Sequence, residues 1–170
     1  HGYDKQPFPG EFPSVLMSNG TGSFNQINFE NEVSFYHGGA SGDFDNDGDL
    51  DVFIIEPGSG KTAILVNNES FFDFNKTLID QSLTQNFFNA ELFDLNKDGF
   101  LDIIAGGHDW DNDGYSKTPL IIYGDGMDFV GNDTFRMPQS NIEFQGVVTD
   151  FEFYDLNYNG NYEIIISRTG

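Results

Sequence analysis

The amino-acid sequence predicts an all-β fold made of β-propeller blades, in which each blade is a sheet of four antiparallel strands. Three observations lead to this prediction. A nine-residue loop rich in oxygen side chains occurs three times, at residues 43–51, 94–102 and 155–163. Each copy runs into a short apolar stretch rich in β-branched residues, which is typical of a buried strand. Plain hairpins alternate with these loops, so that the chain reads as a repeat.

The first loop has a carboxylate at every second position, from Asp43 through Asp45, Asp47 and Asp49 to Asp51. Five such groups would repel one another strongly in a low-dielectric loop unless a hard cation lay among them. Oxygen ligands without Cys or His select calcium over zinc or copper. The glycine at loop position 6 supplies the positive φ that the turn needs. The loop is therefore a predicted calcium site.

The other two loops keep an oxygen side chain at positions 1, 3, 5 and 9 and glycine at position 6. In the second loop the candidate ligands are Asp94, Asn96, Asp98 and Asp102. In the third they are Asp155, Asn157, Asn159 and Glu163, with Asn161 at position 7. The third loop is either a weak calcium site or a metal-free turn held by hydrogen bonds of its Asn side chains.

The alternative for this spacing is the EF-hand, which needs a bidentate Glu at position 12 and a helix on either side. Position 12 is Ile54, Ala105 and Ile166 in the three copies, so the EF-hand pattern fails each time. We therefore expect each loop to be the turn of a β-hairpin, with the cation holding its two strands in register.

The repeats divide the chain into blades. Equivalent loop residues are 51 and 61 positions apart, from Asp47 to Asp98 and from Asp98 to Asn159, which agrees with about 40–60 residues per blade. The expected parts are an irregular lead-in at 1–13, a half blade at 14–30, whole blades at 34–75 and 86–130, and a half blade at 146–170. Three blade equivalents are fewer than the ~4–8 of a closed propeller. The chain is thus expected to be a segment of a larger propeller, or one completed by oligomerisation.

Residues 42–52 resemble the FG-GAP or VCBS repeat, the blade unit of integrin-α-type and many bacterial secreted propellers, and residues 93–104 match nearly as well. The third copy departs at Asn159 and Glu163. The resemblance covers roughly residues 14–170. It implies calcium held by side chains at positions 1, 3, 5 and 9 and by the carbonyl at position 7, which belongs to Asp49 in the first loop and Phe100 in the second. Integrin α chains carry cysteines and this chain has none, which fits a bacterial surface or secreted protein better.

The charge balance limits the partners. Against 28 acidic residues stand 7 basic ones, a formal charge of −21, which argues against binding to nucleic acid or to an anionic membrane. The longest apolar runs are strand-sized, so no membrane insertion is expected. Because extracellular calcium would offset part of the charge and fill weak sites, we expect an extracellular location.

A fourth acidic stretch, residues 109–114, begins like the loops but has Lys117 at position 9. We expect an insertion loop there, with or without a cation. It holds Trp110, the only tryptophan, close to His108 and Tyr115. These residues could stack on a sugar, or Trp110 could simply cover a blade edge.

The expected function is a non-catalytic, calcium-stabilised module that binds carbohydrate or a surface protein through exposed loops, as in cell adhesion. The sequence has no Gly-x-Ser-x-Gly elbow and no His-Glu-x-x-His motif. The alternative is part of a calcium-dependent polysaccharide lyase, since some lyases resemble this architecture. His37, His108 and Tyr115 would then be the candidates for proton abstraction, although the scarcity of basic residues argues against an acidic polymer as substrate.

Overall fold

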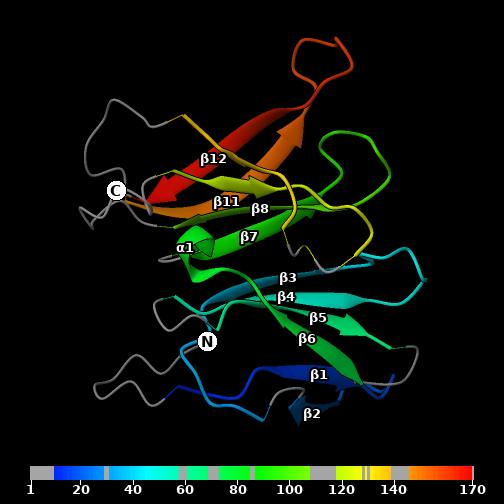
Figure 1. Cartoon of the computed structure of the whole chain (residues 1–170). Helices are drawn as coiled ribbons and strands as arrows, with labels where there is room; N and C mark the ends of the chain where they lie inside the picture. Colours follow the sequence, from blue (N-terminus) through cyan, green and yellow to red (C-terminus); the bar gives the residue numbers. More distant parts are fainter. Residues whose placement is uncertain are drawn as a thin grey trace.

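The fold is described by a computed structural model covering residues 10–28, 31–57, 61–68, 73–84, 87–107, 118–127, 129, 131–138 and 146–169 (Figure 1). Its strands are β1 (Ser14–Ser18), β2 (Phe24–Asn28), β3 (Gly38–Gly42), β4 (Asp51–Ile55), β5 (Ala63–Asn67), β6 (Phe74–Leu78), β7 (Phe87–Phe93), β8 (Asp102–Gly107), β9 (Leu120–Ile122), β10 (Thr134–Arg136), β11 (Val147–Tyr154) and β12 (Glu163–Thr169).

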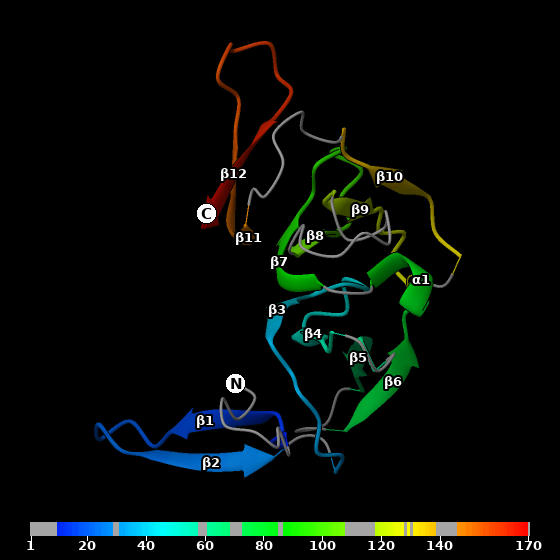
Figure 2. The ribbon, with the colours of Figure 1, turned by 90° about the vertical axis from the view of Figure 1, so that its left-hand side faces the viewer.

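The strands form four antiparallel sheets, which confirms the predicted all-β class. Two sheets have four strands in chain order, β3-β4-β5-β6 and β7-β8-β9-β10, and we call them blade 1 and blade 2. The other two are hairpins, β1-β2 and β11-β12. Figure 2 shows these hairpins at opposite ends of the molecule, with the two blades between them. The four sheets do not close into one continuous sheet within the part of the chain that the structure describes.

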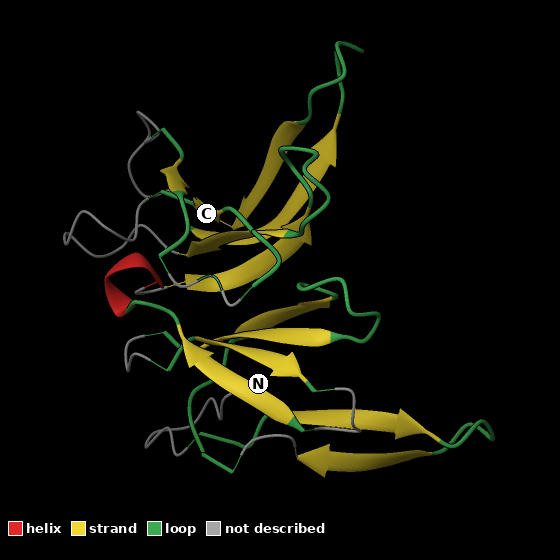
Figure 3. Cartoon of the chain, turned by 45° about the vertical axis from the view of Figure 1, so that its right-hand side comes forward, coloured by secondary structure: helices red, strands yellow, loops and turns green. Residues whose placement is uncertain are grey.

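Each nine-residue loop is the turn of a hairpin, as the sequence predicts. Gly42 pairs with Asp51 where β3 meets β4, Phe93 pairs with Asp102 where β7 meets β8, and Tyr154 pairs with Glu163 where β11 meets β12. The residue before position 1 therefore always lies opposite position 9. Strands and not helices flank the loops (Figure 3), so the EF-hand alternative is excluded.

The outer strands of both blades end later than the sequence predicts. β6 runs to residue 78 rather than 75, and the last strand of blade 2 is β10 at 134–136, beyond the expected limit of 130. Phe129, which the expected blade at 86–130 includes, has a φ of 61° and is 4 % exposed. Its ring packs edge-on against Phe44 at 5.1 Å. Phe129 is therefore a core residue in the connection before β10.

The apolar core fills the spaces between neighbouring sheets. One cluster joins blade 1 to blade 2 and includes Phe53 and Ile64 from blade 1 with Phe87 and Ile103 from blade 2. A second cluster joins blade 2 to the β11-β12 hairpin, with Ile104 on one side and Phe151 on the other. β3, the first strand of blade 1, contacts β7, the first strand of blade 2, and β7 contacts β11 of the last hairpin. Successive blades thus pack face to face, as in a propeller.

Gly38 marks a place where two sheets approach closely. A Cβ atom on Gly38 would meet the carbonyl oxygen of Phe88 in β7. Because backbone cannot yield as a flexible side chain can, glycine is needed at this crossing.

A single turn of helix, α1 (Gln81–Thr84), connects blade 1 to blade 2. Asp80 accepts a hydrogen bond from the amide of Ser82 at 2.8 Å and so starts the turn. None of the helices in the described residues is long and apolar enough to cross a membrane.

Candidate metal centre

The three loops share one backbone conformation. Position 6 is glycine with a φ of 86° to 98°, as the sequence predicts. Position 4 is also left-handed, although no glycine stands there: Asn46 has a φ of 61°, Lys97 of 65° and Tyr158 of 59°. Two left-handed residues separated by one position curl the chain, so that the amides of positions 5 to 7 turn inward.

The inward amides bond to the acidic side chains of the same loop. In loop 1, the carboxylate of Asp43 accepts from the amides of Asp47 and Gly48, both at 3.1 Å. Asp45 accepts from the Asp47 amide at 3.3 Å, and Asp47 accepts from the amide of Asp49 at 3.0 Å. These bonds orient the side chains at positions 1, 3 and 5.

Position 9 ties the loop to the rest of its blade. Asp51 is fully buried and accepts from the amide of Phe44 at 2.7 Å and from the amide of Asn67, at the end of β5, at 2.9 Å. Asp102 repeats both bonds in loop 2. It accepts from the amide of Leu95, at position 2, at 2.8 Å and from the amide of Gly124, which follows β9, at 3.0 Å. A single carboxylate thus joins the loop to the third strand of its blade.

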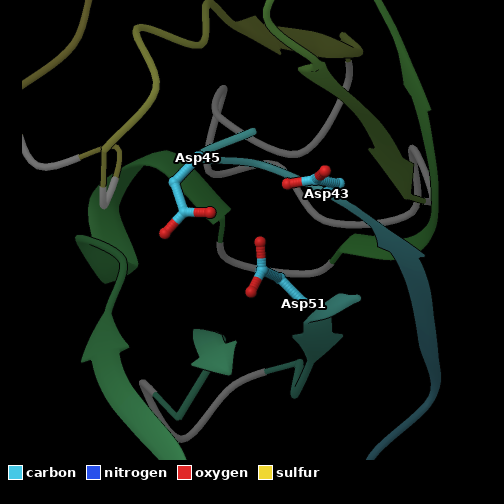
Figure 4. A group of neighbouring side chains, drawn as sticks. All are labelled: Asp43, Asp45 and Asp51. Carbon is cyan, nitrogen blue, oxygen red and sulfur yellow. The ribbon is translucent and has the colours of Figure 1, made fainter. Parts of the chain in front are cut away.

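Loop 1 brings three carboxylates together. One oxygen from each of Asp43, Asp45 and Asp51 lies within 4.8 Å of the other two, and Figure 4 shows the three side chains pointing toward one another. Calcium–oxygen distances are about 2.3–2.6 Å, so that two ligands on opposite sides of one ion lie about 4.6–5.2 Å apart. The spacing and the all-oxygen donor set therefore fit calcium.

The electrostatics of loop 1 also favour a bound cation. Burial, followed by the neighbouring charges of Asp47 and Asp43, raises the pKa of Asp45. Burial also raises the pKa of Asp51, against the two backbone hydrogen bonds that lower it. Without a cation these carboxylates are therefore costly to ionise, and a bound cation would offset that cost.

Loop 2 repeats the hydrogen-bond frame. Asp94 accepts from the amides of positions 5 and 6 at 3.1 and 3.0 Å, and Asp98 accepts from the amide of Phe100 at 2.9 Å. Burial raises the pKa of Asp102. Asn96 at position 3 donates from its side-chain amide to Asp98 at 2.8 Å. Of the residues that the structure describes, those of loop 2 do not bring three carboxylates as close together as loop 1 does.

Loop 3 keeps the frame with fewer charges. Asp155 accepts from the amides of positions 5 and 6 at 3.0 and 2.8 Å, and Asn159 accepts from the amide of Asn161 at 2.7 Å. Glu163 accepts from the position-2 amide and from the side-chain amide of Asn157, both at 2.7 Å. The fold of the loop is thus complete, with two carboxylates where loop 1 has five.

The remaining sequence candidates are not residues of the three loops. His108, Trp110, Tyr115 and the acidic stretch 109–113 are outside the described residues. The exposed ring of His37 lies 4.4 Å from the ring of Phe88, edge-on, and its Nδ1 is 3.3 Å from the Phe88 carbonyl oxygen. His37 thus lies at the contact between β3 and β7, away from the calcium loops.

One set of contacts had no clear signal in the sequence. In loops 1 and 2 the position-4 side chain reaches the next loop: Asn46 donates to the carbonyl of Gly99 at 3.1 Å, and the ammonium of Lys97 donates to the carbonyl of Gly160. Position 4 carries no ligand, and its residue type differs in every copy. Only the backbone conformation makes the side chain point to a neighbour.

Comparison with known proteins agrees with this geometry. The match to FG-GAP-like repeats extends over residues 43–105, from the first position of loop 1 to the end of the apolar run after loop 2. No curated protein and no solved structure matches the chain. Residues 43–105 of this propeller-type chain are therefore an FG-GAP-like repeat segment.

Proposed function

We propose that this chain is a non-catalytic calcium-binding module whose loops 1 and 2 each hold one Ca²⁺, with loop 3 as a weaker site. The observation that supports this best is the convergence of Asp43, Asp45 and Asp51 within 4.8 Å on a frame that already orients them. In each loop the ligands would be the side chains at positions 1, 3, 5 and 9 and the carbonyl at position 7. The role of the cation is structural, because it offsets repulsion between carboxylates that join strands of one blade.

We further propose that the module is extracellular, on a secreted or cell-surface protein of a bacterium. Calcium sites of extracellular modules work at about 10⁻⁴–10⁻³ M, a concentration found outside cells. The formal charge of −21 makes the calcium-free chain repel itself, and extracellular calcium would relieve part of that repulsion.

The ligand that we propose is a carbohydrate, with a surface protein as the alternative. A hollow of about 540 Å³ lies beside loop 2, where Asn96 and Asp98 line it, and its other lining residues with polar side chains are Tyr123, Asp125, Asn132 and Asp133. Such groups can donate to and accept from sugar hydroxyls. The nearby loop 2 would link the shape of the hollow to calcium.

A glycan-array screen with calcium and with EGTA tests the proposal. Calcium-dependent binding that is weakened by Asn132→Ala supports it. Binding to no glycan in either buffer would leave the protein-partner alternative, which a surface-protein array tests. The polysaccharide-lyase alternative predicts an unsaturated product from pectic, ulvan-type or alginate polymers, and the non-catalytic proposal predicts none.

A further inference from the structure

The contacts between successive loops follow one rule, and this rule occurs twice in the chain. The residue just before a loop packs against position 8 of the next loop. A Cβ on Gly42 would lie 2.5 Å from Leu101, and the ring of Phe93 packs edge-on against Tyr162 at 4.8 Å. In addition, position 4 of loops 1 and 2 donates to the position-6 carbonyl of the next loop, as described for Asn46 and Lys97.

Both halves of one more such junction are present, at opposite ends of the molecule, and both are exposed. On loop 3, Tyr154 precedes position 1 and is 53 % exposed, and Tyr158 at position 4 is 83 % exposed. On loop 1, Leu50 at position 8 is 62 % exposed, next to Gly48 at position 6. By the rule, Tyr154 would pack on Leu50, and the Tyr158 hydroxyl would donate to the Gly48 carbonyl.

The adjoining sheets show the same complementarity. In blade 1 the strand after the loop, β4, pairs with β5, and Phe53 opposite Ile64 is fully buried. The equivalent strand β12 has no third strand beside it in the described structure, and Ile165, the counterpart of Phe53, is 45 % exposed. An open edge of this kind accepts a further strand.

The β1-β2 hairpin has the form of the missing part. Its last strand pair, Ser18 opposite Phe24, corresponds to Asn67 opposite Phe74 at the end of β5-β6. Leu16 then corresponds to the fully buried Leu65, yet Leu16 is 64 % exposed. In this alignment Val15 lies opposite Ile165, and the Ser18 amide faces Glu163 as the Asn67 amide faces Asp51.

We propose that loop 3 and β12 of one copy of this chain dock on loop 1 and the β1-β2 hairpin of a second copy. The described residues of each copy contain two whole blades and two complementary half blades, so that a second copy can supply the strands that each half blade lacks. The contact is heterologous, and two copies occupy all of these surfaces if a half turn relates them. This inference goes beyond the proposed function and rests on neither calcium nor a carbohydrate ligand.

Engineered cysteines test the register, and the natural chain has no cysteine to interfere. An Ile165→Cys chain is mixed with a Val15→Cys chain under oxidising conditions. We expect a disulfide-linked heterodimer, because residues directly opposite in an antiparallel pair have Cα atoms about 4.5–5.5 Å apart. The matched control mixes Ile165→Cys with Leu16→Cys, whose side chain points to the other face of the sheet. Equal yields in both mixtures, or no disulfide with Val15→Cys, would overturn the proposal.

The mass in solution is the second test. Light scattering should give twice the 19.0 kDa of one chain. Leu50→Lys and Tyr154→Glu should each reduce the mass to that of a monomer. Mixing the two variants should restore the dimer, because one junction then pairs Lys with Glu and the other keeps its natural residues. Leu78→Lys, at a leucine that is 56 % exposed on an outer strand, should remain dimeric. A natural chain that stays monomeric at all concentrations contradicts the proposal.

Discussion

Replacement of Asp51 by alanine should destabilise the protein even without calcium. The side chain is fully buried, and its carboxylate accepts from the backbone amides of Phe44 at 2.7 Å and Asn67 at 2.9 Å. Alanine leaves both donors without this acceptor. The loop then loses its link to β5, and blade 1 loses the connection between its turn and its third strand.

The magnitude follows from the two amides. An orphaned buried donor costs about 1–3 kcal/mol, so two give about 2–6 kcal/mol. Two effects reduce this sum. Asn67 is only partly buried, so that water can reach its amide, and removal of a carboxylate whose pKa is raised by burial relieves an unfavourable charge. We therefore expect a loss of about 2–4 kcal/mol in unfolding free energy.

Urea unfolding in EGTA and in calcium measures this loss, and Asp47→Ala is the matched control. Asp47 is exposed and accepts one bond, from the amide of Asp49, so its replacement in EGTA should cost at most about 1 kcal/mol. In calcium both variants should also lose the stabilisation that loop 1 supplies, about 2.7 kcal/mol at a calcium concentration 100 times the Kd. If Asp51→Ala costs no more than Asp47→Ala in EGTA, the proposed role of position 9 is wrong.

Two further predictions concern pH and blade packing. The pKa values of Asp45, Asp51 and Asp102 are raised above 3.8 in the folded chain. The calcium-free folded state therefore binds more protons than the unfolded state just above pH 3.8. Its free energy of unfolding should fall as the pH rises through this window. Because protons compete with calcium for the same oxygens, the difference in Tm between calcium and EGTA should be largest near neutral pH and disappear toward pH 4; an unchanged difference in acid would contradict this. Gly38→Ala should lower the free energy of unfolding by about 1–3 kcal/mol, because its Cβ would meet the backbone of Phe88. Chemical denaturation measures this loss. A denaturation midpoint equal to that of the natural chain would show that the two blades can move apart without cost.

Local sequence was enough to predict the hairpins. The alternation of oxygen side chains, the glycine at position 6 and the apolar run after position 9 are all determined within about twelve residues. The strands at Asp51–Ile55 and Asp102–Gly107 accordingly begin at position 9 in the structure, and the glycines have positive φ. The closely packed faces between sheets explain why β-branched and aromatic residues follow each loop.

Features that depend on packing between repeats could not be predicted. No local pattern marks Phe129, in the connection before β10, as a core residue that packs against Phe44. The left-handed residue at position 4 is Asn, Lys or Tyr, and only Asn is common in that conformation, so that no residue type marked it. The second hydrogen bond of Asp51 goes to an amide 16 residues away, and its partner can be identified only when the register of β4 and β5 is known.

A calcium titration by calorimetry tests the central claim most directly. It compares the natural chain with a double variant, Asp45→Asn and Asp51→Asn, in which the side-chain amides keep the shape and an acceptor oxygen at positions 3 and 9. The control variant is Asp73→Asn, which changes an exposed carboxylate outside the loops. We predict that the natural chain and Asp73→Asn bind calcium alike and that the double variant loses one site. A natural chain that binds no calcium at millimolar concentrations, or a double variant that binds as the natural chain does, would contradict the assignment of loop 1 as a calcium site.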